Sequence, residues 1–184
     1  MDIFAHALWA GAGAKKLNDK FEIENKPKVS PGWTAFWGVF PDFFAFTIPF
    51  MTMLYVVAFK GFNISDFRGP QSDLRGFEEM QRAFDFAPTL YQYSHSLIIF
   101  LTIFILTWIY FKRPRFELLG WALHILIDIF SHSAEFYPTP LFFPLSDWKF
   151  LDGVSWGNTY YMIINYSLLL LMVLYFIFRK KKLE

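Results

Sequence analysis

The sequence contains no cysteine, which excludes disulfide bonds and thiolate metal ligands. It also lacks a large excess of charge, because 17 Lys and Arg residues are balanced by 16 Asp and Glu residues. We therefore expect no nucleic-acid partner, since such partners require a strongly basic surface. Internal repeats and low-complexity tracts are absent too, and residues 1–184 are expected to form a single domain.

Apolar residues, in contrast, are abundant. Hydrophobic residues make up 55% of the chain and aromatic residues 22%, which is typical of an integral membrane protein. Four apolar stretches of about 20 residues are long enough to cross a bilayer as helices: residues 33–59, 90–111, 116–134 and 158–178. The predicted fold class is all-α, a polytopic membrane helical bundle with four spanning helices and a short N-terminal helix, residues 1–14, that enters the bundle.

Lysine and arginine are distributed unevenly between the connecting segments. Twelve of the 17 lie before residue 33, in the turn 112–115 or after residue 178. Because basic segments stay on the cytoplasmic side, we expect the N-terminal lysine-rich loop and the C-terminus to be cytoplasmic and the two long loops to face outward. Asp2 stands where a signal peptide would carry basic residues, so no cleavable signal is expected.

A few ionisable side chains interrupt the apolar stretches. Three histidines lie in these stretches and the fourth, His6, lies in the apolar N-terminal segment 1–14, and two aspartates are the only carboxylates well inside the stretches. The six residues are His6, Asp42, His95, His124, Asp128 and His132. An unpaired charge at such a depth costs several kcal/mol, and a cation is a suitable partner. Imidazoles and carboxylates together form a ligand set suited to zinc, with manganese or iron as substitutes.

His124, Asp128 and His132 follow at intervals of four residues, which in a helix places all three on one face. The helical rise separates the backbones of His124 and His132 by about 12 Å, which makes it hard for both to bind one ion. We expect a main ion to be held by four residues: Asp42, His95, His124 and Asp128. His132 is then expected to serve a second metal, bridged by Asp128, or to support the first. A multi-metal site would activate water and bind phosphate oxygens.

Several short motifs occur in a fixed order along the chain: His6, Pro41-Asp42, Ser94-His95-Ser96, the pair His124 and Asp128, and the stretch HILIDIFSHSAEFYPTPLFFPLSD. This succession resembles the bacterial membrane-bound metal-dependent hydrolases, and the resemblance covers nearly the whole chain. It implies a multi-pass protein of the bacterial cell (inner) membrane.

More remotely, the ligand order is similar to that of the zinc-dependent phospholipase C and single-strand nuclease superfamily, all-helical enzymes that cleave phosphoesters. This similarity implies one or two zinc ions, and at most three, and makes Asp42 a catalytic base as well as a ligand. It implies six metal ligands: His6, Asp42, His95, His124, Asp128 and His132. The HxxxE pair of those enzymes is missing, and Glu135 is left as the candidate for a role in substrate binding.

These observations lead us to expect a membrane-embedded metal-dependent hydrolase that cleaves a phosphoester of a lipid or lipid-linked substrate by metal-activated water. The site is expected in the outer half of the bilayer, with membrane lipids as partners. A metal-ion or proton-coupled transporter that uses the same His/Asp site is the alternative. A third is a scaffold protein whose polar residues hold helices together. The sequence does not determine the oligomeric state.

Overall fold

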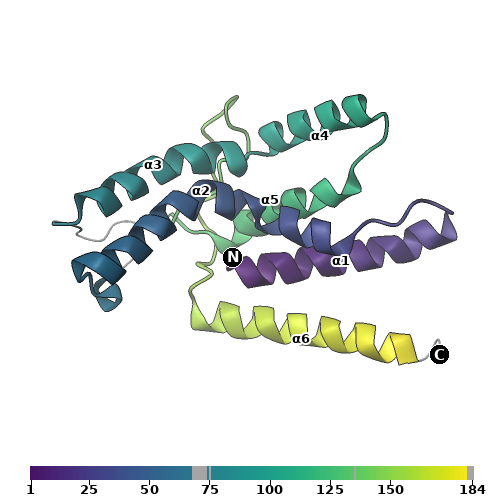
Figure 1. Cartoon of the computed structure of the whole chain (residues 1–184). Coiled ribbons are helices and arrows are strands. Elements are labelled where there is room, and N and C mark those ends of the chain that lie inside the picture. The colour runs from purple at the N-terminus through teal and green to yellow at the C-terminus, as the bar shows by residue number, and fades with distance from the viewer. Residues whose placement is uncertain (68–73, 75, 135, 182–184) are drawn as a thin grey trace.

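A computed structural model describes residues 1–67, 74, 76–134 and 136–181. These residues form an all-helical structure without a β-strand. Figure 1 shows the helices arranged side by side, with the N-terminus in the middle of the molecule. The six α-helices are α1 (Ile3–Ile23), α2 (Pro31–Lys60), α3 (Glu78–Ser94), α4 (Leu97–Phe111), α5 (Leu119–Ser131) and α6 (Thr159–Lys181), with 3₁₀ turns at Ile64–Asp66 and Phe116–Leu118.

Helix α2 is the longest element and has well-defined ends. Ser30 caps its N-terminus, Pro31 occupies the first helical position, and Gly61 ends it in the left-handed conformation at φ 73°. The helix continues through Pro41 and Pro49, each of which removes one backbone hydrogen bond. Its axis bends near the middle (Figure 1).

Two helices are long and apolar enough to cross a membrane, Pro31–Lys60 and Thr159–Arg179. They confirm the predicted segments 33–59 and 158–178. Helices α3 and α4 are bent by 55° at a short break and add a third span if the pair is counted as one. The structure therefore gives two or three candidate spans within its described residues, and the predicted count of four is not confirmed.

The other two predicted segments differ from the structure for local reasons. Segment 90–111 is interrupted because Ser96 starts α4 anew, accepting hydrogen bonds from the backbone amides of Ile98 and Ile99. Segment 116–134 contains α5, which has 13 residues. That is fewer than the roughly 20 residues a spanning helix needs.

The N-terminal helix enters the bundle as predicted but is not short. Helix α1 has 21 residues instead of ending at residue 14, and the buried positions near its start include Ala5, His6 and Ala10. Lysine, leucine and glutamate tolerate a helical backbone well, so the polar segment extends the helix. The guanidinium group of Arg179 at the end of α6 also pairs with Asp19 on this extension.

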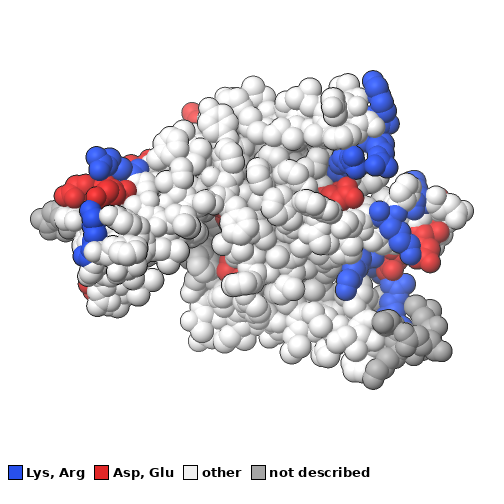
Figure 2. Space-filling model, viewed as in Figure 1, with Lys and Arg blue, Asp and Glu red and all other residues white. Residues whose placement is uncertain are grey.

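Most charged side chains gather at two ends of the molecule, and a broad band with few charged atoms lies between them (Figure 2). One end holds the ion pair of Lys60 and Glu79, at the close of α2 and the start of α3. The opposite end joins the C-terminal parts of α1, α4 and α6 (Figure 1). The basic loop after α1 and the turn 112–115 line one cavity there. The three basic stretches thus lie at the same end of the molecule. This is required if all three are to lie on the same side of a membrane.

Helices α1, α2 and α5 approach one another closely at glycine positions. A Cβ atom added at Gly38 would contact Ala10 Cβ and the backbone of His6, and one added at Gly120 would collide with the Thr34 carbonyl oxygen. Small residues allow the backbones of membrane helices to touch in this way. The contact brings the start of α1 and the middle of α2 against α5.

We predict that Gly120→Ala destabilises the protein by about 1–3 kcal/mol, because the new methyl group forces backbone atoms of α2 and α5 apart. Thermal unfolding of the detergent-purified protein measures the change. Gly13→Ala on α1 is the matched control, since a Cβ atom there would meet its nearest neighbour at an ordinary 3.8 Å. Equal unfolding temperatures for the two variants would contradict the close approach.

Candidate metal centre

Three parts of the bundle bring four polar side chains together. Asp42 comes from α2, His95 directly follows α3, and His124 and Asp128 lie one turn apart on α5. One ligand atom from each lies within 4.8 Å of the others. Asp42 is the most exposed of the four, at 7%. Two carboxylates and two imidazoles packed together away from solvent form a group that can hold a metal ion.

Five of the separations between these atoms are close to those of the ligands around one four-coordinate metal ion. His95 Nε2 lies 3.6 Å from Asp42 Oδ1 and 3.5 Å from Asp128 Oδ2, and His124 Nε2 lies 3.7 and 3.0 Å from the same oxygens. The two Nε2 atoms are 3.0 Å apart. Ligands at about 2.0–2.1 Å from a tetrahedral zinc ion are about 3.3–3.4 Å from one another. The observed separations scatter around this value, so one ion fits between the four atoms.

Both imidazoles of this four-residue cluster are held through their other ring nitrogen. His124 Nδ1 donates to the carbonyl oxygen of Gly38 at 2.7 Å, so its Nε2 lone pair is free to face the cluster. His95 Nδ1 lies 2.9 Å from the Ser94 hydroxyl oxygen. Partners of this kind fix the orientation of a ligating ring and increase its basicity. The carbonyl group of Gly38 therefore positions the His124 ring in the cluster.

The two carboxylate oxygens of Asp128 face different groups. Oδ2 faces the cluster, whereas Oδ1 lies 2.6 Å from the Met1 amino nitrogen, 3.0 Å from His6 Nε2 and 3.6 Å from His132 Nε2. The Met1 nitrogen is also 3.2 Å from His132 Nε2. His6 and His132 thus lie beside the second oxygen of Asp128, adjacent to the four-residue cluster.

His132 lies just beyond α5 and not inside the helix, but its side chain still faces Asp128 from the side on which the four-residue spacing predicted it. Helix α5 ends at Ser131, and His132 has an extended backbone, with φ −115° and ψ 136°. Its Nδ1 lies 2.9 Å from the Tyr91 hydroxyl oxygen and 3.0 Å from the Tyr137 carbonyl oxygen. These contacts hold Nε2 toward Asp128 although the helix has ended.

Hydrogen bonds among the described residues do not satisfy all of these atoms. Asp128 Oδ2 and both ring nitrogens of His6 are buried without a hydrogen-bond partner there, because the short distances lack hydrogen-bond geometry. An unsatisfied buried polar atom is costly. A cation among the carboxylates and imidazoles would supply the missing partner. The donor set and the unsatisfied oxygen both fit a metal ion.

Tyr91 belongs to this site, and sequence reasoning missed it. Its ring stacks on the imidazole of His95 with centroids 3.6 Å apart and planes 18° from parallel. The helical interval of four residues between Tyr91 and His95 is the signal that would have found it. Glu135, the predicted substrate-binding residue, lies outside the described residues.

A cavity of about 260 Å³ opens onto the site from the side of α1 and α2. Asp42 and His132 line its inner part, and the rest of its wall is largely aromatic: Phe4, Phe46, Phe50, Phe136 and Trp156. Phe4 and Phe50 are also exposed on the outer surface of the protein. The cavity therefore connects the buried polar residues with an apolar face.

No family model matches the chain, and neither a curated protein nor a solved structure shows significant similarity to it. The fold and the side-chain geometry are accordingly the basis for assigning a function.

We predict that the purified protein retains about one zinc or similar divalent ion per chain at the four-residue cluster. Asp128→Asn should abolish retention, because it removes a charge that balances the cation. Elemental analysis of detergent-purified protein measures the ratio. The matched control is Asp147→Asn in the exposed loop after α5, which should retain the ion; wild-type protein without bound metal would refute the centre.

Proposed function

We propose that the protein is a membrane-embedded metal-dependent hydrolase, with zinc as the preferred ion, that cleaves a phosphoester of a lipid or lipid-linked substrate. The observation that carries this proposal is the buried cluster of two histidines and two aspartates at the inner end of an apolar cavity. When bound there, a divalent ion would lower the pKa of a coordinated water and polarise a phosphoryl oxygen.

Asp42 has the position that the reaction requires of a base. It is the one member of the four-residue cluster that also lines the 260 Å³ cavity. Its carboxylate therefore meets both the cluster and any substrate phosphate that enters. In this proposal Asp42 holds and deprotonates the attacking water, in addition to its role as a ligand.

The character of the cavity supports a lipid substrate. Its wall has little polar surface apart from Asp42, His132 and the first two residues of the chain. Aromatic side chains provide favourable contact area for acyl or isoprenoid chains. The exposed rings of Phe4 and Phe50 lie where such a chain would enter from the apolar face. A small polar substrate would gain nothing from this entrance.

We further propose that the protein is a multi-pass protein of the cell membrane with its basic end in the cytoplasm. The three basic stretches gather at one end of the molecule (Figure 2), and basic segments are retained on the cytoplasmic side. In this orientation the metal centre lies toward the outer half of the bilayer, and α5 lies within the membrane beside α2 although it is too short to cross alone.

Cysteine labelling tests this orientation, because the chain has no cysteine of its own. In intact cells, a membrane-impermeant maleimide should label Asp147→Cys, which lies in the loop predicted to face outward, and should not label Lys28→Cys. Both variants should react after the membrane is permeabilised. The opposite labelling pattern would contradict the proposed orientation.

Substrate turnover tests the hydrolase. We predict that the metal-loaded protein hydrolyses one or more lipid phosphoesters in detergent, measured as release of phosphate-containing product. Asp42→Asn should reduce kcat by at least about 100-fold, because general-base catalysis contributes about that much. The protein must keep its metal in this comparison. Asp147→Asn, the matched control, should keep the wild-type rate.

Absence of hydrolysis across phospholipids and lipid-linked phosphoesters would contradict the hydrolase proposal. Metal-dependent ion flux into liposomes without turnover would replace it with a transporter that uses the same residues.

A further inference from the structure

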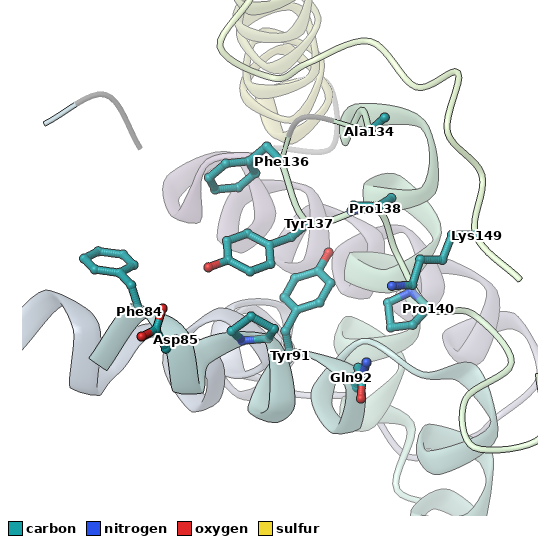
Figure 3. Close-up of a pocket in the computed structure, with 11 residues that line it drawn as sticks. Phe84, Asp85, Tyr91, Gln92, Ala134, Phe136, Tyr137, Pro138, Pro140 and Lys149 are labelled. Atoms are coloured by element: carbon teal, nitrogen blue, oxygen red, sulfur yellow. The ribbon is translucent and has the colours of Figure 1, made fainter. Parts of the chain in front are cut away.

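Cavities with charged walls lie outside the aromatic cavity at Asp42, and they differ in their balance of charge. A cavity of about 390 Å³ beside Tyr91 is lined by one acid, Asp85, and one base, Lys149 (Figure 3). A basic cavity of about 420 Å³ lies at the end of the molecule where the basic stretches gather. Its charged lining residues are four bases and one acid: Lys26, Lys28, Arg113, Arg115 and Glu117. Such an excess of positive charge favours an anionic ligand, and arginine in particular binds phosphate oxygens through parallel N–H donors.

The two lysines of the basic cavity have acidic neighbours, but these ion pairs are exposed. Lys26 Nζ lies 2.6 Å from Glu24 Oε2. Lys28 Nζ lies 3.2 Å from Glu22 Oε2. Both lysine side chains are more than half exposed. Because exposed ion pairs contribute little to stability, both ammonium groups can turn to a bound phosphate at small cost.

A largely apolar cavity of about 290 Å³, the α2–α4 cavity, adjoins the basic cavity. Its apolar wall comes mainly from the start of α2 and from α4, through Trp33, Trp37, Ile103 and Phe111. Arg115 and Glu117 line both cavities. The basic side chains therefore lie directly beside an apolar wall.

The α2–α4 cavity extends from the basic end toward the band with few charged atoms. Ile103 precedes Phe111 by eight residues, which is about 12 Å of rise along a helix, and every residue of α4 is uncharged. Trp33, near the start of α2, is 61% exposed, and tryptophan is enriched at the membrane–water interface. The two adjoining cavities thus follow the order of a phospholipid, with a place for phosphate at the interface and an apolar wall leading inward.

We propose that the basic cavity and the α2–α4 cavity together bind one phospholipid with a net negative head group. The phosphate lies among the basic side chains, and an acyl chain lies along the wall of the α2–α4 cavity. Basic pockets between membrane helices are suited to anionic head groups. None of the described residues lines both this pair of cavities and the cavity at Asp42. The bound lipid is therefore separate from the substrate of the proposed hydrolase, and its binding does not require hydrolysis.

Lipid retention by the full-length protein tests this site. The purified protein is mixed in detergent with phosphatidylglycerol or phosphatidylethanolamine of the same acyl chains, and bound lipid is counted by native mass spectrometry. We expect one phosphatidylglycerol per chain, bound about fivefold more tightly than phosphatidylethanolamine, whose ammonium group cancels the negative charge. Glycerol 3-phosphate, which has a phosphate but no acyl chain, should displace little of the bound lipid.

A charge variant assigns the retained lipid to the basic cavity. Arg113→Met should weaken phosphatidylglycerol binding about fivefold, and the exposed position of Arg113 makes a folding defect unexpected. Lys20→Met is the matched control, because Lys20 lies in the last turn of α1 and pairs with Glu24 without lining the cavity. It should bind phosphatidylglycerol as wild type does.

A second variant tests the acyl-chain part of the site. Thr107→Trp should weaken phosphatidylglycerol binding at least as much as Arg113→Met, because Thr107 lines the α2–α4 cavity and a larger ring would fill it. Thr102→Trp is the matched control. Thr102 is also on α4 and its hydroxyl likewise bonds to a backbone carbonyl, but it does not line this cavity.

Equal binding of the two lipids by wild-type protein would overturn the proposal, as would equal binding by Arg113→Met and Lys20→Met. Unchanged binding by Thr107→Trp would show that no acyl chain occupies the α2–α4 cavity, which also overturns it. Full displacement by glycerol 3-phosphate would mean that the basic cavity binds free phosphate and not a lipid. Each of these results leaves the hydrolase proposal to its own test.

Discussion

The burial of Asp128 in an apolar bundle is the constraint on which the rest of the structure depends. Its side chain is fully buried, and an ionised carboxylate in such a place costs several kcal/mol unless it is compensated. Nitrogen atoms surround both of its oxygens: imidazoles of the cluster face Oδ2, and Met1, His6 and His132 face Oδ1. The four histidines and Met1 are thereby held around the carboxylate of Asp128.

The helices are shaped to make this arrangement possible. Gly120 lets α5 touch α2, Gly38 lets α2 touch α1, and the Gly38 carbonyl accepts a hydrogen bond from His124. The break between α3 and α4 places His95 at a helix end, where its side chain can reach Asp128. In a continuous helix, backbone geometry would have fixed His95 to a single face. The break between α3 and α4 therefore allows His95 to join the polar cluster. Non-helical backbone at membrane depth is tolerated where it is buried in protein.

The surroundings of the cluster divide the molecule into regions of different chemistry. A band with few charged atoms separates two charged ends (Figure 2). An aromatic cavity reaches Asp42, and a cavity that Asp85 and Lys149 also line lies beside Tyr91. The lipid phosphoester of the proposed function has an apolar part and a charged part, which match the aromatic cavity and the polar cluster at its inner end. The proposed function rests on that match together with the geometry of the four-residue cluster.

The sequence by itself determined the all-helical class, two of the candidate spanning segments and the four residues of the cluster, because ionisable residues in apolar stretches are few and must find partners. Hydropathy did not reveal the interruption at Ser94 to Ser96, since local capping by serine overrides apolar periodicity. Nor did four-residue spacing show that α5 ends before His132, because a helix end depends on backbone contacts formed only in the fold. Only the tertiary structure decided three features of the site. These are the oxygen of Asp128 that each imidazole faces, the stacking of Tyr91 on His95 and the two cavities. These features join residues far apart in the chain, and sequence spacing carries no information about such distances.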